Sequence, residues 1–424
     1  MGAEVRVYAG IPPVAVFASS TGTPLVLDST TGKLYYLATP GDVVTPVTVG
    51  ASGGTGGFVV NGRLTTESGV PVSQTDRLAQ THIFWTPYHD NVLSLWDSVA
   101  LAWTPTKFTE IDFPVGTVIK NAGYDMFAFL NAGAVNLESL LWKNSVVTVT
   151  IAVPGVVHWV AHGHAVGDSI VFTTTGALPT NLVVGTLYYV FSVTDADNFT
   201  VATYPGNPVI TTSGSQSGVH TAYSSRIRGT AVTYQDGRLC KSGDKTRLLL
   251  GSFMPDSTTT VEDSKGGVTS QLGGKRRLFN LYNQCDRSLI VVDTTDNWAA
   301  VAGLRFANGN AGNQVEAFIG WAESDIWAEA RATLGLSSSS VAGFVGVCVN
   351  DGSTFAGRTV GIYNSNASTM NLTGAGDYAG PAKTGHNTIA WFEKAATSIG
   401  TNLWIGDGGG VSTFSSGLNA MIKG

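Results

Sequence analysis

Short apolar runs separated by turn residues are the feature that most constrains how this chain folds. The segments HIFWTPY (82–88), VLSLW (92–96) and YDMFAFLN (124–131) are rich in aromatic and β-branched side chains. Such runs are typical of strands, because these side chains pack well on a pleated surface. The 424 residues also include 52 glycines, which supply the backbone angles that tight turns require. We therefore expect an all-β protein built of several β-sandwich domains.

Charge is sparse and unclustered along the chain. Only 13% of the residues are charged, the net charge is -6, and the longest basic run is the triplet Lys275–Arg277. Because binding to a phosphate backbone needs a dense basic surface, we expect no nucleic-acid partner. No apolar run approaches the roughly 20 residues with which a helix crosses a bilayer, so we expect no membrane insertion.

The first residues and the cysteines indicate the compartment in which the protein folds. The first residues, MGAEVRVYAGIPP, lack the apolar stretch and cleavage site of a secretory signal, which favours folding in a cytosol. Cys240, Cys285 and Cys348 are far apart in sequence and have no CxxC spacing. We expect them to be small buried hydrophobic residues and not a disulfide framework or a zinc site.

A change of style between residues 145 and 223 indicates an inserted domain. Strands rich in Val and Thr follow one another there. The flanking segments, LESLLWKN before and SRIRGTAVTYQDGRLCKSG after, both contain aromatic and charged residues instead. This pattern predicts a small β-barrel inserted into a sandwich, with its two ends close together. An insertion of this kind is expected to be removable without unfolding the rest of the protein.

Composition divides the remainder of the chain. VLDSTTGKLYYL predicts a hairpin around Thr31-Gly32, and the glycine run ASGGTGGF (51–58) predicts a flexible linker. Residues 255–277 have almost no apolar side chains, which indicates an exposed connection or a loop packed against another subunit. The predicted parts are 1–57, a first sandwich of 58–144 plus 224–254, the barrel of 145–223, the connection of 255–277, and a C-terminal sandwich of 278–424.

Several ordered motifs resemble a known family. The runs NGRLTTESGVPVSQTD (61–76), LCKSGDKTRLLLGSF (239–253) and RRLFNLYNQCDR (276–287) are similar to those of tailed-bacteriophage virion proteins of the tail-fibre or head-fibre type. The resemblance covers roughly residues 60 to 424 apart from the insertion. It implies a fibre or spike subunit of a phage head or tail, made in the host cytoplasm and assembled as a homotrimer in the virion. The implied partners are capsid, portal or tail proteins and a host-surface glycan, and no cofactor is implied.

The insertion resembles a second recurrent phage element. Its elements here are His162-Gly163, Gly167-Asp168, Leu178-Pro179, Tyr188-Tyr189 and Asn198–Thr200. The resemblance implies that the His-Gly…Gly-Asp segment is a loop between two strands, and that His164 stands where other members carry an apolar residue. The first 57 residues are similar in style to segments by which phage appendages dock on the virion.

The histidines of the stretch HGHAVGDSIVF (162–172) allow two interpretations. Within a strand, His162 and His164 would share one face, and three chains meeting at an axis would offer six nitrogens to an octahedral metal. Gly163 and the Gly-Asp turn instead predict a tight loop, in which Asp168 accepts hydrogen bonds before Phe172 enters the barrel core. We expect a structural loop without a metal, with a metal at the two histidines as the alternative.

Catalytic motifs are missing from the sequence. It contains no Gly-x-Ser-x-Gly, HExxH or P-loop pattern. A glycosidase needs two carboxyl groups about 5 to 10 Å apart, and acidic residues that lie beside aromatics are Asp97, Asp125, Glu323, Asp325 and Glu393. Carboxylates that keep strand edges soluble are the simpler interpretation. We expect no enzyme; the alternatives to a fibre are a polysaccharide depolymerase tailspike or a purely structural decoration or tail protein without ligand.

Tryptophans of the last predicted domain are the candidate ligand-binding residues. Trp321, Trp327, Trp391 and Trp404 offer aromatic faces that stack on the apolar side of a sugar ring. Most large aromatics of a sandwich are core residues, so we expect only one or two tryptophans to be exposed.

Overall fold

The computed structural model describes residues 58–267, 272–336, 341–364, 370–396, 403–406 and 416–424, together with four short strands nearer the N-terminus. The chain divides into two compact units, Met1–Phe58 and Val59–Gly424. Among the described residues there is no α-helix, only a short 3-10 turn at Ala307–Gly309. The prediction of an all-β protein with several sheets is confirmed.

The first unit holds one antiparallel sheet. Its strands follow chain order and are β1 (Val14–Ala18), β2 (Pro24–Asp28), β3 (Lys33–Tyr36) and β4 (Thr45–Pro46). Strands β2 and β3 pair as the predicted hairpin requires. The predicted linker up to residue 57 lies outside the described residues.

Hairpins account for the sheets of the first predicted sandwich. In the larger one, Asp236 and Gly237 adopt positive φ angles of 52° and 75°, as a tight two-residue hairpin turn requires. Its strands, in spatial order, are β12 (Ala134–Leu141), β11 (Tyr124–Asn131), β21 (Asp244–Phe253), β20 (Arg238–Lys241) and β19 (Val232–Gln235), with β24 (Leu278–Asn280) also paired to β21. Smaller sheets consist of β10 (Ile111–Pro114), β7 (His82–Pro87) and β5 (Gly62–Thr65), and of β8 (Val92–Asp97) and β9 (Ala102–Lys107).

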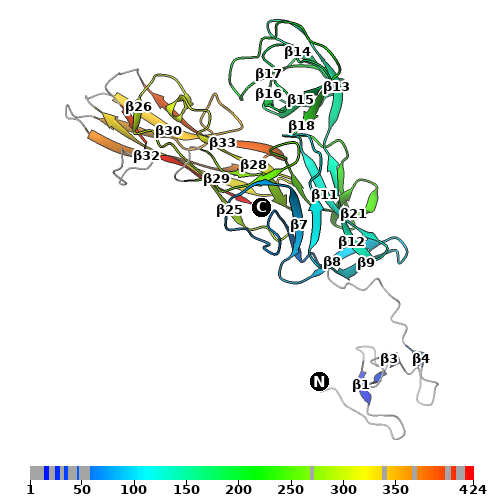
Figure 1. The fold of residues 1–424 in the computed structure, drawn as a ribbon. Helices are drawn as coiled ribbons and strands as arrows, with labels where there is room; N and C mark the ends of the chain where they lie inside the picture. The colour runs from blue at the N-terminus through cyan, green and yellow to red at the C-terminus, as the bar shows by residue number, and fades with distance from the viewer. Residues whose placement is uncertain are drawn as a thin grey trace. The chain divides into compact units, whose positions relative to one another are not determined.

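Two large sheets form the C-terminal part of the second unit (Figure 1). One contains β31 (Val360–Asn364), β30 (Val341–Val349), β33 (Gly385–Ala395), β28 (Gln314–Ile319), β23 (Lys275–Arg276), β22 (Val261–Asp263) and β6 (Arg77–Gln80), with β27 (Arg305–Phe306) on β33. The other contains β25 (Asp286–Val292), β35 (Gly417–Lys423), β29 (Asp325–Leu336), β34 (Leu403–Ile405) and β26 (Asn297–Ala299), with β32 (Met370–Pro381) on β29. Buried side chains from both sheets make one continuous hydrophobic core.

The predicted inserted barrel is confirmed as a closed six-stranded barrel (Figure 1). Its strands in spatial order are β13 (Asn144–Val149), β14 (Val156–His158), β17 (Asn198–Ala202), β16 (Leu187–Val193), β15 (Ser169–Thr174) and β18 (His220–Ser224). First and last strands pair directly, with Asn144 opposite Tyr223, so the two ends of the insertion lie side by side. Ile170, Phe172 and Phe199 fill its interior.

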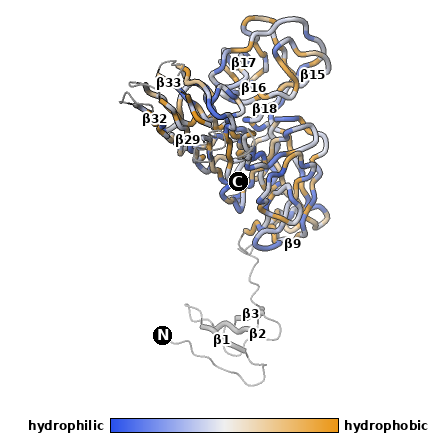
Figure 2. Tube along the Cα trace, turned by 60° about the vertical axis from the view of Figure 1, so that its left-hand side comes forward, coloured by the Kyte–Doolittle hydropathy of each residue, from blue (hydrophilic) through white to orange (hydrophobic). Residues whose placement is uncertain are grey.

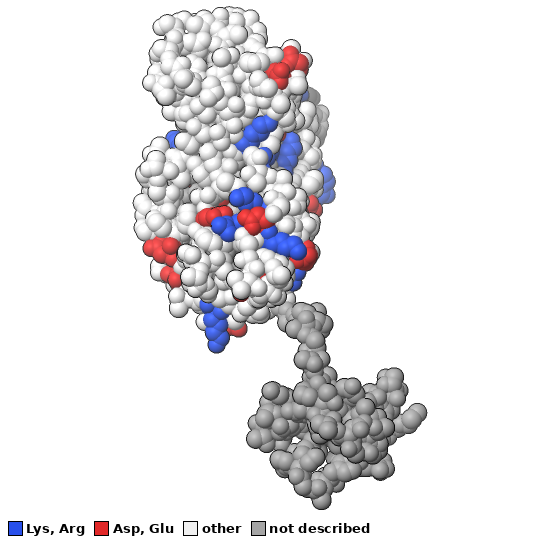
Figure 3. Space-filling model, turned by 90° about the vertical axis from the view of Figure 1, so that its right-hand side faces the viewer, with Lys and Arg blue, Asp and Glu red and all other residues white. Residues whose placement is uncertain are grey.

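Few charged side chains lie on the barrel. Residues 144–224 contain no Lys, Arg or Glu, and their acidic residues are Asp168, Asp195 and Asp197. Figure 3 shows this lobe almost wholly white above the charged sandwich surface. Figure 2 shows both hydrophobic and hydrophilic residues in this lobe, and along β18 buried side chains alternate with partly buried ones. Within the described part of the chain, no helix is long and apolar enough to cross a membrane.

The barrel is anchored to the sandwich by aromatic contacts. Tyr189 and Tyr204 on its outer surface join a buried cluster with Phe306, Ala390 and Phe392 of the sandwich. The Tyr204 and Phe306 ring centroids are 4.6 Å apart. The barrel therefore covers part of the sandwich core, and removing it would expose that cluster to water. Because of this contact, we now expect deletion of the insertion to destabilise the sandwich.

The prediction for residues 255–277 is wrong in the part that the structure describes. Strands β22 and β23 from this segment belong to the large eight-stranded sheet, and Val261 is fully buried. The polar composition reflects buried ion pairs: Asp263 accepts hydrogen bonds from Arg276 at 3.2 Å and from Arg287 at 2.7 Å. Because β6, from the first predicted sandwich, pairs with β22, the segment joins the two predicted sandwiches instead of separating them.

Truncating Tyr204 tests the anchoring of the barrel. We expect Tyr204→Ala to lower the free energy of unfolding by about 3 kcal/mol, as burial of a large aromatic side chain predicts. Tyr204→Phe is the matched control, because the hydroxyl makes only a 3.5 Å contact with Thr388. Urea denaturation measures both variants. An alanine variant as stable as the wild-type protein would show that the barrel is not part of the sandwich core.

Candidate functional site

The clearest candidate site is the outer face of the sheet formed by β25, β35, β29 and β32. Side chains of β29 alternate along the strand: Ala328 and Ala330 are fully buried, while Trp327, Glu329 and Arg331 point outward. The outward residues of these four strands are called the Trp327 face below. The pairing registers between the strands arrange them in rows.

One row of the Trp327 face is polar. Asn419 of β35 lies opposite Glu329 of β29, and Asp377 of β32 lies on the other side of Glu329. In the next row, Gly417 lies opposite Arg331. Because paired residues of antiparallel strands point to the same side of a sheet, these groups share the solvent-facing surface.

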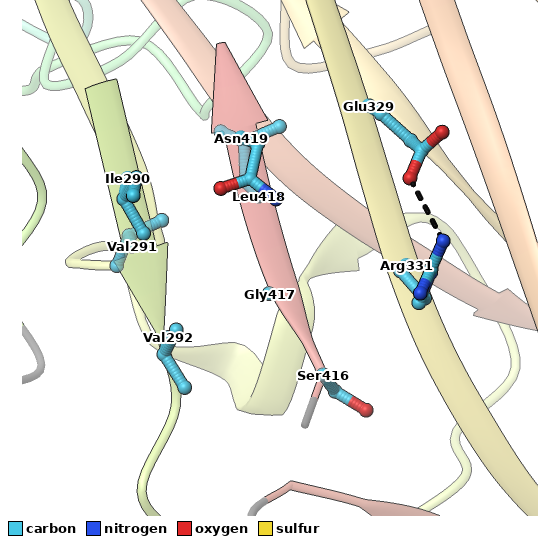
Figure 4. A pocket seen from close by; sticks show the side chains of 9 residues that line it. All are labelled: Ile290, Val291, Val292, Glu329, Arg331, Ser416, Gly417, Leu418 and Asn419. Atoms are coloured by element: carbon cyan, nitrogen blue, oxygen red, sulfur yellow. Dashed lines mark hydrogen bonds and ion pairs between the residues drawn. The ribbon is translucent and has the colours of Figure 1, made fainter. Parts of the chain in front are cut away.

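A shallow hollow of about 200 Å³ lies over this region (Figure 4). Gly417 lies between Val292 on one neighbouring strand and Arg331 on the other, and a Cβ atom there would lie only 2.6 Å from the backbone oxygen of Val291. Figure 4 shows Asn419, Glu329 and Arg331 around the same space. The hollow is therefore walled by an amide, a carboxylate and a guanidinium group, all planar hydrogen-bonding groups.

Surface ion pairs lie on the Trp327 face, one of them with Arg358, which lies just before β31 and borders the face. Arg331 lies 3.3 Å from Glu329, and Arg358 donates two hydrogen bonds to Asp377, at 2.8 and 2.6 Å. The hydrogen bonds from Arg358 lower the pKa of Asp377. Opposite charges therefore alternate across the surface, which offers both donors and acceptors to a polar ligand.

Trp327 supplies an aromatic surface next to the polar row. It is 44% exposed and is flanked on the neighbouring strands by Met421 and Ala379. The flat side of an indole ring packs on apolar surface, and its N–H donates one hydrogen bond. A sugar ring has matching chemistry, with one apolar side and a rim of hydroxyl groups.

The four tryptophans predicted to stack on a sugar differ in how far they are exposed. Trp391 and Trp404 are fully buried in the sandwich core, so the prediction that they bind a glycan is wrong. Trp321 is partly buried and fixed by a 2.6 Å hydrogen bond to Glu323 and by the guanidinium group of Arg228, 5.9 Å from its ring. Only Trp327 of the four combines substantial exposure with neighbouring polar groups.

Two of the five acidic residues considered for hydrolysis are buried and paired within the protein. Asp125 is buried against Arg228, with which it makes hydrogen bonds of 2.7 and 2.8 Å. Glu393 is fully buried, and this burial raises its pKa to about 7 despite hydrogen bonds from Trp298 and Arg305. Neither carboxyl group is accessible to a polysaccharide. The remaining three residues lie at the surface: Glu323 accepts from Trp321, Asp97 accepts from backbone N–H groups of its turn, and Asp325 begins β29.

The stretch HGHAVGDSIVF forms the predicted loop between β14 and β15. Gly163 and Gly167 adopt positive φ angles of 70° and 86°, and the Asp168 carboxylate accepts a 2.9 Å hydrogen bond from the N–H of Ala165. His162 accepts the N–H of His164 at its Nδ1 atom, at 2.9 Å. The predicted tight loop is therefore confirmed, whereas its purely structural role stays a prediction.

His164 is buried in a largely aromatic environment. Its ring lies 5.1 Å from Trp159 and stacks 6.0 Å from His162. The Nδ1 atom is 3.5 Å from Asp168, longer than a normal hydrogen bond, and burial lowers the pKa of His164 although Asp168 opposes this shift. Within the described ranges, no group of three or more His, Cys, Asp or Glu residues is arranged to hold a metal ion.

Comparisons with known proteins give little further information. No family model matches the chain, and no curated protein matches it significantly. Among solved structures it is similar to one described as the structure of infectious bursal disease virus Gx strain, at 11% identity over 73% of this chain and 72% of that chain. The TM-score of 0.19 is too low to indicate a shared fold.

Replacing His164 tests the role of the loop. The unfolded chain protonates this histidine below about its ordinary pKa of 6.5, whereas the lowered pKa keeps it neutral in the fold. The unfolded state then binds more protons, so His164 reduces stability as pH falls from 6.5 through the folded pKa. We expect His164→Leu to lose less stability than wild type between pH 7.5 and pH 5, measured by thermal melting.

The exposed His158, which contacts Asn198, provides the control for this experiment. The His158→Gln variant is melted over the same pH range to show the effect of removing an exposed histidine. Equal pH dependence of wild type and His164→Leu would contradict the assignment of a neutral buried His164.

Proposed function

We propose that this protein is a structural subunit of a bacteriophage particle, a fibre or spike of the head or tail, that binds a host-surface glycan through the Trp327 face. The virion assignment is supported by the motifs that resemble phage virion proteins. The glycan assignment is supported by one observation: an exposed tryptophan adjoins a hollow lined by amide, carboxylate and guanidinium groups.

The chemistry of the Trp327 face fits a saccharide better than a strongly charged polymer. The charges of three ion pairs (Glu329–Arg331, Asp377–Arg358 and Asp286–Lys423) neutralise one another, which leaves Asp325 and does not favour a strongly charged polymer. Hydroxyl groups of a sugar are able to donate to the carboxylates and accept from the guanidinium groups, while its C–H side stacks on Trp327. The hollow is shallow, so a single site is expected to bind weakly.

Weak individual sites suit a protein displayed in several copies on one particle. When linked sites bind the same surface, the second contact becomes intramolecular, and the overall affinity exceeds that of either site. Rigid display also helps, because a preorganised face loses little entropy on binding. Here the face is part of a sheet whose opposite side is the sandwich core. A homotrimer would provide three such faces.

Substitution of the tryptophan tests the binding face. On an array of bacterial capsule and O-antigen fragments, we expect Trp327→Ala to weaken binding at least about tenfold, the effect of losing about 1.4 kcal/mol. Tyr363→Ala is the matched control, because Tyr363 is 57% exposed but lies on β31 of the other large sheet. Binding that is equal in wild type and Trp327→Ala would exclude this face.

Assembly and location test the virion assignment. Light scattering of the purified full chain should report three chains per particle, and mass spectrometry of purified phage should detect the protein in intact virions. A stable monomer at micromolar concentration would remove the trimer and its multivalent binding. Absence of the protein from purified virions would contradict the structural role altogether.

A further inference from the structure

A groove of about 470 Å³ lies where the barrel meets the sandwich, and it shares no lining residue with the hollow of the Trp327 face. One wall comes from the loop after β14 and from β16 and β17 of the barrel. The other comes from the segment that follows β30 and from Lys383. Ligand sites typically occupy about 300 to 1,000 Å³ and occur preferentially at junctions between domains. Both the size and the position of this groove therefore fit a binding site.

The barrel wall of the groove is apolar. Phe191 is 40% exposed and Val166 is 59% exposed, and both line the groove together with Pro205. Val166 belongs to the loop HGHAVGD, whose turn at Gly167 places it next to the sandwich. Exposed large apolar side chains gathered around a hollow indicate a contact surface.

The sandwich wall of the groove is polar. Asp351 accepts hydrogen bonds from the N–H and hydroxyl of Ser353, both at 2.7 Å, and from the hydroxyl of Thr354 at 2.8 Å. Partial burial acts to raise the pKa of Asp351, but these hydrogen bonds more than offset it and lower the pKa. The exposed Lys383 lines the same groove and makes no ion pair with a residue that the structure describes. The wall thus presents one fixed anion and one available cation.

The two walls are held in fixed positions. A Cβ atom on Gly206 of the barrel would lie 2.9 Å from the backbone nitrogen of Ser353, so the two segments are in close contact at the base of the groove. On the sandwich side, the Asn350 side chain donates to Asn387 at 2.9 Å and accepts the N–H of Thr388 at 3.0 Å. A preformed groove of this kind binds without paying a large ordering cost.

We propose that this groove is a second saccharide site, independent of the Trp327 face, that binds an uncharged sugar residue. The apolar side of the ring packs on Phe191 and Val166. Its hydroxyl groups donate to Asp351 and accept from Lys383. Because the anion and the cation balance each other, the groove favours a neutral sugar over a carboxylated or sulfated one.

Saturation-transfer NMR on the full chain tests this site with defined probes. These are the methyl α-glycosides of glucose, galactose, mannose and N-acetylglucosamine as neutral sugars, and the methyl glycoside of N-acetylneuraminic acid as an anionic one. We expect at least one neutral glycoside to bind. Both Phe191→Ala and Lys383→Gln should weaken this binding about tenfold or more, as loss of an aromatic contact or of a hydrogen bond to a charged group predicts.

The variant Trp327→Ala separates the two sites, because it should leave binding in the groove unchanged. Circular dichroism checks that each variant is folded, and Lys383→Gln at an exposed position keeps the test open if Phe191→Ala unfolds. The proposal is overturned if no neutral glycoside binds, if binding survives both groove substitutions, or if the anionic glycoside binds more tightly than every neutral one. Loss of binding in Trp327→Ala alone would assign it to the Trp327 face.

Discussion

The alternation of side chains along strand β29 is the constraint on which the sandwich and its proposed site both depend. Ala328, Ala330 and Ala332 point inward and are fully buried in the same core as Trp391. Trp327, Glu329 and Arg331 point outward from the same strand. A shift of one residue in this register would place a charged pair in the core and alanines on the surface. Burial of these three alanines in the core therefore determines which residues of β29 lie on the Trp327 face.

Ion pairs in the protein interior are a second constraint on the fold. Asp263 binds Arg276 and Arg287, and Asp125 binds Arg228, in each case within the protein interior. Leaving one member of such a pair unpaired costs several kcal/mol, so these contacts define which segments belong together. Asp125 and Arg228 are 103 residues apart in sequence, whereas Asp263 joins three segments that lie within 24 residues of one another.

Local patterns in the sequence were sufficient to predict the hairpin of β2 and β3, the loop at His164 and the barrel. The glycines around His164 have positive φ angles that few other residues adopt easily, and alternating Val and Thr residues specify the barrel strands. The segment 255–277 was misassigned because buried arginines and aspartates have the same composition as an exposed loop. Only their partners show that they are buried.

The Trp327 face was predicted only in part. Trp327 was identified from its residue type, but so were Trp391 and Trp404, and nothing local distinguishes a core tryptophan from an exposed one. Asp377 and Asn419 join the face by pairing with Glu329, which lies 48 and 90 residues away in sequence, and a local pattern does not contain such contacts. The alternation in DIWAEARAT (325–333) was the one signal available, since it places W, E and R on a single face of a strand.

Cysteine accessibility along β29 measures this register directly. Residues 327 to 332 are changed one at a time to cysteine, and labelling by a maleimide is measured in the native full chain against the background of its own three cysteines. The account predicts rapid labelling at positions 327, 329 and 331 and protection at 328, 330 and 332. Rapid labelling at 328 and 330, or protection at 329 and 331, would contradict the register and with it the proposed face.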